Sequence, residues 1–185
     1  MGNCVVILLV GFVLLFIQSH PLLPYAKSGL RPDLVLVLVT YLGAHPVIKP
    51  VGGSVVVSIL GYGVAVFSGS PLGLYSFIYL VLFLFVRLLR TLFVLQQISV
   101  LTFLVTISCV LEGGLVFLAC WIFHYSSGVF GMFNRVFIGQ LFFTVVFAPF
   151  IIAALQRFEN VIEKNKNLNL FALLGISVPL RKTKQ

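Results

Sequence analysis

Long hydrophobic runs, separated by short polar or proline-rich connections, organise the whole chain. They predict six helices, at about 4–18, 32–48, 51–67, 72–86, 92–123 and 136–155. A hydrocarbon core of roughly 30 Å requires a helix of about 17 to 25 mostly apolar residues, and several runs meet this length. The strictly alternating segments of roughly ten residues that form membrane β-barrels are missing from the sequence. The pattern therefore predicts an all-α integral membrane protein with about six transmembrane helices in one compact bundle.

Prolines mark several boundaries between these runs. Pro32 and Asp33 open the second helix, because proline is pre-set for a first helical turn and an acid interacts favourably with a helix N-terminus. Pro149 predicts a kink in the last helix, where neighbouring helices satisfy the freed carbonyl. The first run has the length of a signal-peptide core, but no Lys or Arg precedes it and no small-x-small site follows. We interpret it as an uncleaved first span.

Two segments allow alternative interpretations. The run 92–123 is either one tilted helix or a span that ends near Glu112 and continues as an interfacial piece, since Gly113 and Gly114 permit both. The apolar stretch 168–178 is too short to span a membrane. It predicts an interfacial segment or a partner-binding motif.

Composition supports the membrane interpretation. The 185 residues are 61% hydrophobic and 9% charged, with a mean hydropathy of +1.18, which excludes an ordinary soluble domain. The formal charge of +8 could indicate nucleic-acid binding, but the 12 Lys and Arg residues lie between and after the apolar runs. We interpret them as topology signals. The domains predicted are a six-span transmembrane domain, 1–157, and a basic cytoplasmic tail, 158–185.

The basic residues also predict an orientation. With six spans and both termini in the cytoplasm, the inner segments hold nine Lys and Arg residues and the outer segments hold three, which together make the 12. The inner set is Lys49, Arg87, Arg90, Arg157, Lys164, Lys166, Arg181, Lys182 and Lys184, and the outer set is Lys27, Arg31 and Arg135. This bias agrees with the preference for positive residues on the cytoplasmic side.

The stretch from Gly53 to Tyr75 predicts a packing centre, because it contains two helices joined by an uncharged turn. Small residues recur at four-residue spacing along the first helix, interrupted only by Val57, and such a face lets another backbone approach closely in a bilayer. Either a partner or the protein's own helices could cover that face, and Gly61→Leu is expected to disrupt its packing. The candidate packing or partner-contact residues are Gly53, Gly61, Ala65, Gly69, Pro71 and Gly73.

The sequence carries no recognisable catalytic or metal-binding set. His20, His45 and His124 are isolated, and no HExxH motif occurs. A nucleophile at Ser70 would have no histidine in the later spans to activate it. The three cysteines, Cys4, Cys109 and Cys120, share no metal-site spacing and are interpreted as structural thiols. We therefore expect no enzyme activity, no cofactor and no metal.

Glu112 is the only acidic residue within an apolar run, and this makes it the intramembrane polar candidate. An ionised carboxylate at mid-bilayer is costly unless it is paired or hydrated. Glu112 lies either at that depth or near the outer interface beside Gly113. Ser108 lies one turn earlier on the same face, so an inward orientation is possible. A proton-coupled transporter ordinarily has more than one such residue, and the sequence indicates no second member of a relay.

In order along the chain, these motifs resemble the MreD family, the membrane subunit of the bacterial cell-elongation machinery. The resemblance covers most of the chain and rests on its length, the six spans and a proline in the last span before a basic tail. The specific motifs are Pro32-Asp33-Leu34 and Gly61 followed by Gly69-Ser70-Pro71-Leu72-Gly73-Leu74. The family often has an aspartate four residues before its turn motif, whereas this chain has Ala65. A polar role at that position is therefore not expected here.

The resemblance implies a non-enzymatic scaffold of the elongasome in the bacterial inner membrane. Its partners would be MreC, the other elongation proteins and, in a homo-oligomer, a second copy, and it would support lateral peptidoglycan synthesis and cell shape. The compact six-span arrangement is also similar to the substrate-binding subunits of energy-coupling-factor transporters, so the alternative is a vitamin-type transport subunit. Polar residues that could line a ligand pocket are sparse: Tyr25, His45, Tyr62, Ser68, Glu112 and Trp121.

Overall fold

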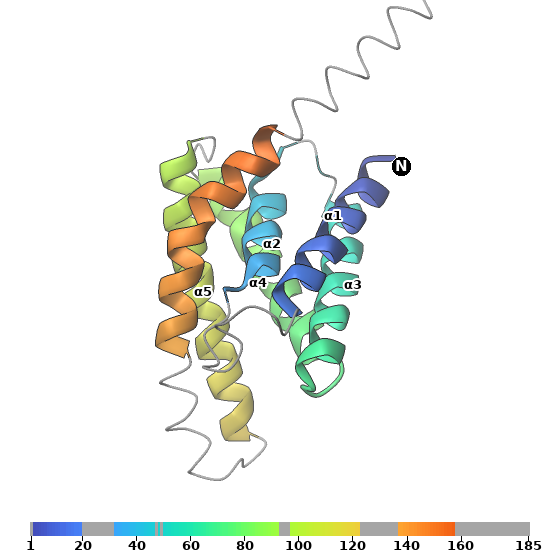
Figure 1. The fold of residues 1–185 in the computed structure, drawn as a ribbon, viewed down its shortest axis with the longest axis vertical. Helices are drawn as coiled ribbons and strands as arrows, with labels where there is room; N and C mark the ends of the chain where they lie inside the picture. The colour runs from blue at the N-terminus through green and yellow to red at the C-terminus, as the bar shows by residue number, and fades with distance from the viewer. Residues whose placement is uncertain are drawn as a thin grey trace, which may run out of the picture. The chain divides into compact units, whose positions relative to one another are not determined.

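The computed structural model describes residues 2–19, 32–46, 48, 50–92, 97–122 and 137–157. These ranges contain six helices and no strand (Figure 1). The helices are α1 (Gly2–Ser19), α2 (Leu34–Ala44), α3 (Pro50–Ser68), α4 (Leu74–Leu92), α5 (Ile98–Ile122) and the final helix (Phe137–Arg157). The all-helical prediction is confirmed for the described part of the chain. The apolar stretch 168–178 and the predicted tail lie outside it.

Four helices are long and apolar enough to cross a membrane: α3, α4, α5 and the final helix. The helix α1 has 18 residues, of which Ile7–Ser19 have described side chains, whereas α2 has 11. With 11 residues, α2 rises by about 16 Å at roughly 1.5 Å per residue. It therefore covers about half of a hydrocarbon core of roughly 30 Å. Six helices in the described residues match the predicted number, and four of them meet both the length and the apolar character of a full span.

The structure selects one of the two alternatives for the fifth run and differs from the sequence-based expectation at the end of the fourth. The fifth run forms a single helix, α5, which continues through Gly113 and Gly114, so no break follows Glu112. The helix α4 extends to Leu92 rather than stopping near Val86. Arg87 and Arg90 consequently lie within its last two turns. The final helix is continuous through Pro149.

The helix α2 forms the centre of the compact unit of residues 1–152. All of its 11 residues are buried, and it packs against α1, α3, α4 and α5 (Figure 1). Figure 1 also shows that α2 begins partway along its neighbours rather than at the end of the bundle. A helix start at that depth places unpaired backbone N–H groups inside the protein, where they need partners.

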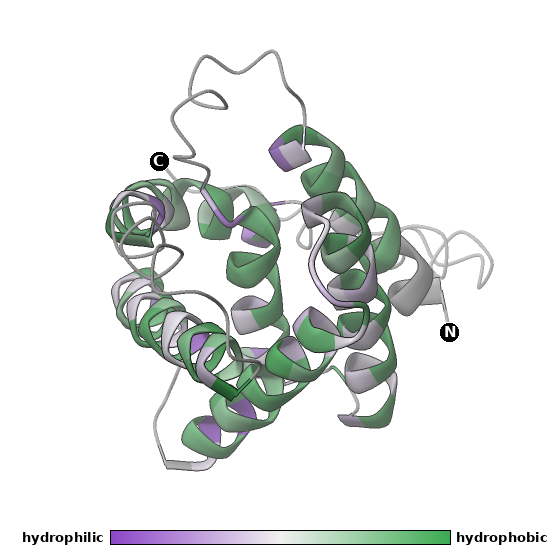
Figure 2. Ribbon diagram, turned by 90° about the horizontal axis from the view of Figure 1, so that it is seen from below, coloured by the Kyte–Doolittle hydropathy of each residue, from purple (hydrophilic) through white to green (hydrophobic). Residues whose placement is uncertain are grey.

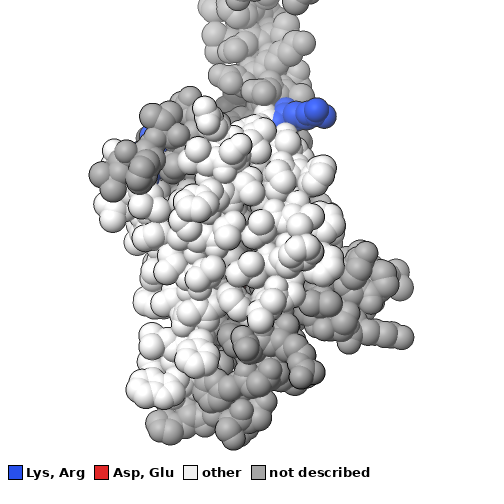
Figure 3. Space-filling view, turned by 90° about the vertical axis from the view of Figure 1, so that its left-hand side faces the viewer, with Lys and Arg blue, Asp and Glu red and all other residues white. Residues whose placement is uncertain are grey.

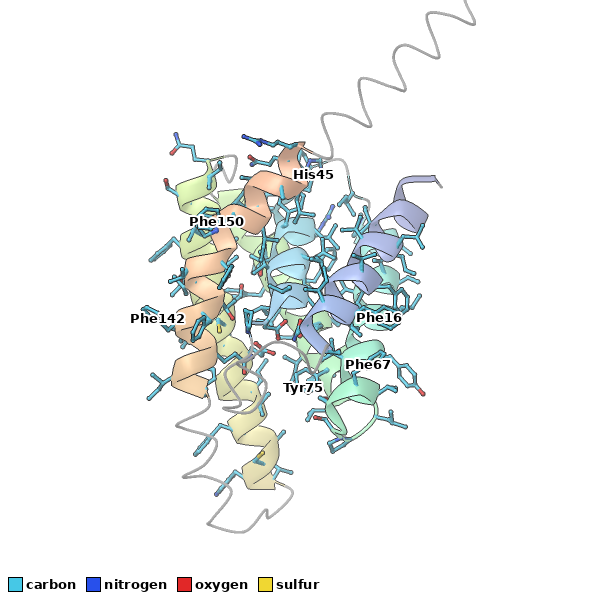
Figure 4. All side chains as sticks on the ribbon, viewed as in Figure 1. Phe16, His45, Phe67, Tyr75, Phe142 and Phe150 are labelled. Carbon is cyan, nitrogen blue, oxygen red and sulfur yellow. The ribbon has the colours of Figure 1, made fainter. Side chains whose placement is uncertain are left out.

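The outer surface of the bundle is apolar. Hydrophobic residues dominate every described helix in Figure 2, on the inner and outer sides alike. Phe142 and Phe150 point away from the bundle and are 64% and 71% exposed (Figure 4). The face of α5 and the final helix in Figure 3 shows no acidic side chain among the described residues. This surface is typical of helices that face lipid.

The connection between α3 and α4 is a tight glycine turn. Gly69 has φ +67°, and Ser70 N–H donates to the Ala65 carbonyl at 3.2 Å. This bond closes a Schellman-type helix end, in which the residue after the cap adopts the left-handed conformation. Gly73 has φ +93°, and its carbonyl accepts the Phe77 N–H at 2.9 Å at the start of α4. The turn is the tight helix connection that the sequence predicts.

Candidate functional site

Asp33 caps the N-terminus of α2 and is 2% exposed. Its Oδ1 accepts the Leu36 backbone N–H at 2.8 Å, which is the usual N-cap bond. Its Oδ2 accepts the hydroxyl of Tyr79 on α4, also at 2.8 Å. The sequence predicts an acid at this helix start, and the structure adds that the helix start is buried. Pro32 lies one residue before the cap rather than in the first turn.

Side chains from two other helices accept two further N–H groups at the start of α2. The Asp33 N–H donates to Thr144 Oγ1 on the final helix at 2.9 Å. The Leu34 N–H donates to Gln18 Oε1, at the end of α1, at 3.2 Å. Because lipid and apolar side chains offer no acceptors, these bonds allow α2 to begin inside the bundle.

Glu112 faces the same centre from α5. It is the fifteenth residue of the 25 in α5 and is 4% exposed, so its side chain points into the bundle. Its carboxyl group lies close enough to the carboxyl group of Asp33 for a hydrogen bond between them. Two carboxyl groups can bond in this way only if one carries a proton, because ionised carboxylates are acceptors only. The inward orientation considered for Glu112 is thus the observed one.

Two buried polar atoms of α5, one of them in this pair, have no hydrogen-bond partner among the described residues. They are Glu112 Oε2 and the Oγ of Ser108, one helical turn earlier on α5. Ser108 is 0% exposed. Buried polar atoms are nearly always hydrogen-bonded, so such an exception calls for an explanation. We call Asp33, Glu112, Tyr79, Thr144 and Ser108 the acid cluster.

Most members of the acid cluster are not apparent as site residues in the sequence. Glu112 is recognisable as a lone acid in an apolar run, and Asp33 as a helix cap, but nothing in either pattern places them side by side. Tyr79 and Thr144 lie in apolar helices without any distinguishing motif. One feature of the sequence does connect the two acids. Only four Asp and Glu residues occur in the chain, and Asp33 and Glu112 are the two that precede the C-terminal tail. Their contact supplies the second acid that the sequence does not reveal.

The small-residue face of α3 packs against α4. A Cβ added at Gly61 would lie 2.6 Å from Ser76 Cα and 2.8 Å from the Tyr75 carbonyl oxygen, so the two backbones are in close contact. A Cβ at Gly53 would meet the Phe83 ring at 2.5 Å. Ala65 is 1% exposed. The protein's own α4 therefore lies against this face at Gly53 and Gly61.

The turn residues have a different environment. Pro71 is exposed, and Gly69 and Gly73 have open space where a Cβ would be. Positive φ angles, rather than close neighbours, explain these two glycines. The predicted packing and turn positions therefore form two groups. Gly53, Gly61 and Ala65 lie on a buried helix face, and Gly69, Pro71 and Gly73 lie in an exposed connection.

At the opposite end of α2, two arginines of α4 bind backbone carbonyls. Arg87 Nη1 donates to the Ile48 carbonyl at 2.9 Å, and Arg90 Nη1 donates to the His45 carbonyl at 3.2 Å. His45 is the C-cap of α2. A guanidinium near a helix C-terminus is favourable because that end carries partial negative charge. These residues were expected to mark a membrane face, and they also tie α4 to the end of α2.

The other polar candidates do not gather around the acid cluster. Tyr62 and Trp121 are 52% and 67% exposed, and Ser68 bonds to Ser70 beside the turn at 2.9 Å. Tyr25 lies outside the described residues. Figure 4 shows Tyr75 at the end of the bundle nearer the start of α2, and His45 at the other end.

No group of three metal-ligating side chains occurs within the described residues. Of the histidines, His45 is described, whereas His20 and His124 fall in gaps of the described ranges. Cys109 is buried and Cys120 half-buried, both as free thiols, and the side chain of Cys4 is not described.

Comparison with known proteins gives no match to a protein-family model, to a curated protein or to a solved structure. The resemblance to MreD therefore rests on the order of the sequence motifs alone.

Proposed function

We propose that this protein is a non-enzymatic scaffold of the bacterial cell-elongation machinery, of the MreD type. In this role it binds MreC in the inner membrane and supports lateral peptidoglycan synthesis. The observation that carries the proposal is the hairpin of α3 and α4, because the most specific part of the resemblance lies there. Gly61 permits the close approach of the two helices, and Gly69 and Gly73 have the backbone angles that the turn requires. The three glycines of the motif thus each have a physical role in the hairpin.

The arrangement of the helices supports a contact role rather than a chemical one for this hairpin. The side of α3 opposite Gly61 is an apolar, exposed stripe, and it is available to a partner's transmembrane helix. Its exposed residues are Val51, Val55, Ile59, Tyr62 and Val66. Packing between helices in lipid depends on close van der Waals contact, which a rigid surface favours.

Deletion of the gene in a rod-shaped host tests the proposal at the level of the cell. We expect rods to become round and MreC to co-purify with the tagged protein from native membranes. Rods of unchanged shape, together with no MreC in the pull-down, would exclude the scaffold role.

Cysteine crosslinking locates the contact. Cys4, Cys109 and Cys120 are first replaced with serine, and single cysteines are then placed at the exposed Val55 or Tyr62. The matched control is a cysteine at Val57, which is 0% exposed. We expect crosslinks to MreC from the exposed positions only. Products confined to the protein's own helices would remove α3 from the partner interface.

The orientation proposed places both termini in the cytoplasm. It is supported by the nine-to-three distribution of basic residues. The two arginine bonds are compatible with it, since they join the end of α2 to the end of α4, which this topology puts on one side of the membrane. Fusion of alkaline phosphatase to the C-terminus should give an inactive enzyme, and fusion within the connection 69–73 an active one.

The second candidate function is a substrate-binding subunit of a small-molecule transporter. One specific observation favours it: two buried polar atoms, Glu112 Oε2 and Ser108 Oγ, have no partner among the described residues. Ligand sites typically combine apolar walls with a few convergent polar groups. A thermal-shift screen with vitamins in detergent distinguishes the two functions, because a ligand at about 100 times its Kd stabilises the folded state by roughly 2.7 kcal/mol. The scaffold proposal predicts no shift.

A further inference from the structure

The hydrogen bonds of the acid cluster distinguish its two carboxyl groups. Asp33 accepts two donors, the Leu36 N–H and the Tyr79 hydroxyl, and lies at the N-terminus of α2, where the helix dipole favours negative charge. Glu112 has no comparable donors, since its Oε2 is unpartnered among the described residues. Donors stabilise the charged form of a carboxyl group. These surroundings therefore favour the ionised form of Asp33 and the neutral form of Glu112.

Within the described ranges, no basic side chain has a hydrogen bond to the pair that would balance two carboxylates. The polar side chains near it, among the described residues, are Tyr79 and Tyr75 from α4, Ser108 and Cys109 from α5, Thr144 from the final helix and Gln18 from α1. Arg87 and Arg90, the basic residues of α4, bond to carbonyls at the other end of α2. Two adjacent negative charges in this apolar interior would repel each other strongly, because the low local dielectric screens them weakly.

We propose that Asp33 and Glu112 form a proton-binding site, in which Glu112 carries the proton and donates it in a hydrogen bond to the Asp33 carboxylate. The geometry makes this proton a link between helices, since Asp33 begins α2 and Glu112 lies on α5. When the proton leaves Glu112 for water, the charge of the pair changes from one negative to two, and the bond between the carboxyl groups is lost. The Glu112 Oε2 and Ser108 Oγ atoms, unpartnered among the described residues, lie one turn apart on α5, and both are buried. Contact between α2 and α5 thus depends on pH.

This site is independent of the proposed scaffold role. It depends on contacts within one chain and holds for a scaffold or for a transport subunit. Loss of MreC binding would not affect it, and its own failure would leave the scaffold proposal unchanged.

Infrared spectroscopy of the purified full-length protein in lipid nanodiscs tests the site directly. A protonated carboxyl group gives a carbonyl stretching band that an ionised one does not. The wild-type protein should show this band at neutral pH, and Glu112→Gln should lose it while keeping an amide donor to Asp33. The matched control replaces both Glu159 and Glu163 with Gln, which should leave the band unchanged. Absence of the band from the wild type at neutral pH, or its survival in a folded Glu112→Gln protein, would overturn the proposal.

A pH titration of the wild type gives a second readout that does not depend on the folding of a variant. Raising the pH should abolish the band, and the melting temperature should fall over the same range. The Glu112→Gln protein should show no corresponding fall. Equal pH dependence of melting in the two proteins would disprove the link between the proton and the contact of α2 with α5.

Discussion

Both ends of α2 have backbone groups without partners inside the helix, and side chains of opposite polarity bind them at the two ends. A helix leaves about four N–H groups unpaired at its start and about four carbonyls at its end. At the start, acceptors gather: the Asp33 carboxyl, Thr144 Oγ1 and Gln18 Oε1. At the end, donors gather, namely the guanidinium groups of Arg87 and Arg90. The choice of groups follows the helix dipole at each end.

The two ends differ in what surrounds those partners. Asp33 is 2% exposed, whereas both arginines are only partly buried. Where water is within reach, it replaces a lost hydrogen bond, but an unpaired group in the interior bears the full cost of desolvation. The acidic end should therefore be far more sensitive to substitution than the basic end.

The largest effect is expected for Asp33→Ala. It leaves the Tyr79 hydroxyl, the Leu36 N–H and Glu112 without their acceptor, and at about 1–3 kcal/mol for each buried unpaired group the total is roughly 3 kcal/mol or more. The free energy of unfolding, measured by denaturant titration in detergent, should fall by that amount. Asp33→Asn is the control, since asparagine also caps helices well. Equal losses for the two variants would contradict the importance of the cap.

Gly61→Leu should be the next most damaging and provides a reference remote from both ends of α2. The new side chain would collide with the backbone of α4 at Ser76, and overpacking costs about 1–3 kcal/mol or more. The same substitution at Gly114, where nothing lies within 4 Å, is the matched control and should not destabilise the protein. Thermal unfolding of both variants in detergent measures the difference. A similar loss at Gly114 would show that contact with α4 is not the cause, because helix propensity alone favours leucine over glycine.

Thr144→Val should have a smaller effect at the acidic end. It keeps the shape of the side chain and removes the acceptor for the Asp33 N–H, at a cost of about 1–3 kcal/mol for a buried unpaired group. Hydrogen exchange at the Asp33 amide, followed by NMR or mass spectrometry, should accelerate. Thr144→Ser restores the hydroxyl and should restore protection. Unchanged exchange in the valine variant would show that this bond does not hold the helix start.

The smallest effect is expected for Arg90→Ala at the basic end. A cation at a helix C-terminus contributes about 0.3–1 kcal/mol, and water can take over the His45 carbonyl. Denaturant titration should show a loss within that range, and Arg90→Lys a smaller one. A loss as large as that of Asp33→Ala would refute the proposed difference between the two ends.

The sequence predicts much of the fold because hydrophobic runs, and the residues that begin or end helices, are local signals. The helical class, the turn at Gly69 to Gly73 and the cap at Asp33 all follow from neighbouring residues. The precise ends of helices follow less well: α4 continues past Val86 to Leu92, and its two arginines bind carbonyls of another segment. An apolar helix that faces lipid on one side also lacks the periodicity that would identify its inner face.

The acid cluster could be predicted only in part. Glu112 attracts attention as an isolated charge, but its partner depends on α5 lying beside the start of α2, a contact between distant parts of the chain. The role of Tyr79 depends in addition on its turn of α4 facing Asp33. Such information is tertiary, and no pattern within one helix contains it.

The glycines of the connection between α3 and α4 carry one further consequence. Gly69 and Gly73 have positive φ angles and open space beside them. The constraint there is handedness and not volume: an L side chain is strained by roughly 1–2 kcal/mol, whereas its mirror image adopts that backbone freely. A D-alanine introduced by chemical ligation would fit both positions. Glycine stands at this turn as the one encoded amino acid without chirality.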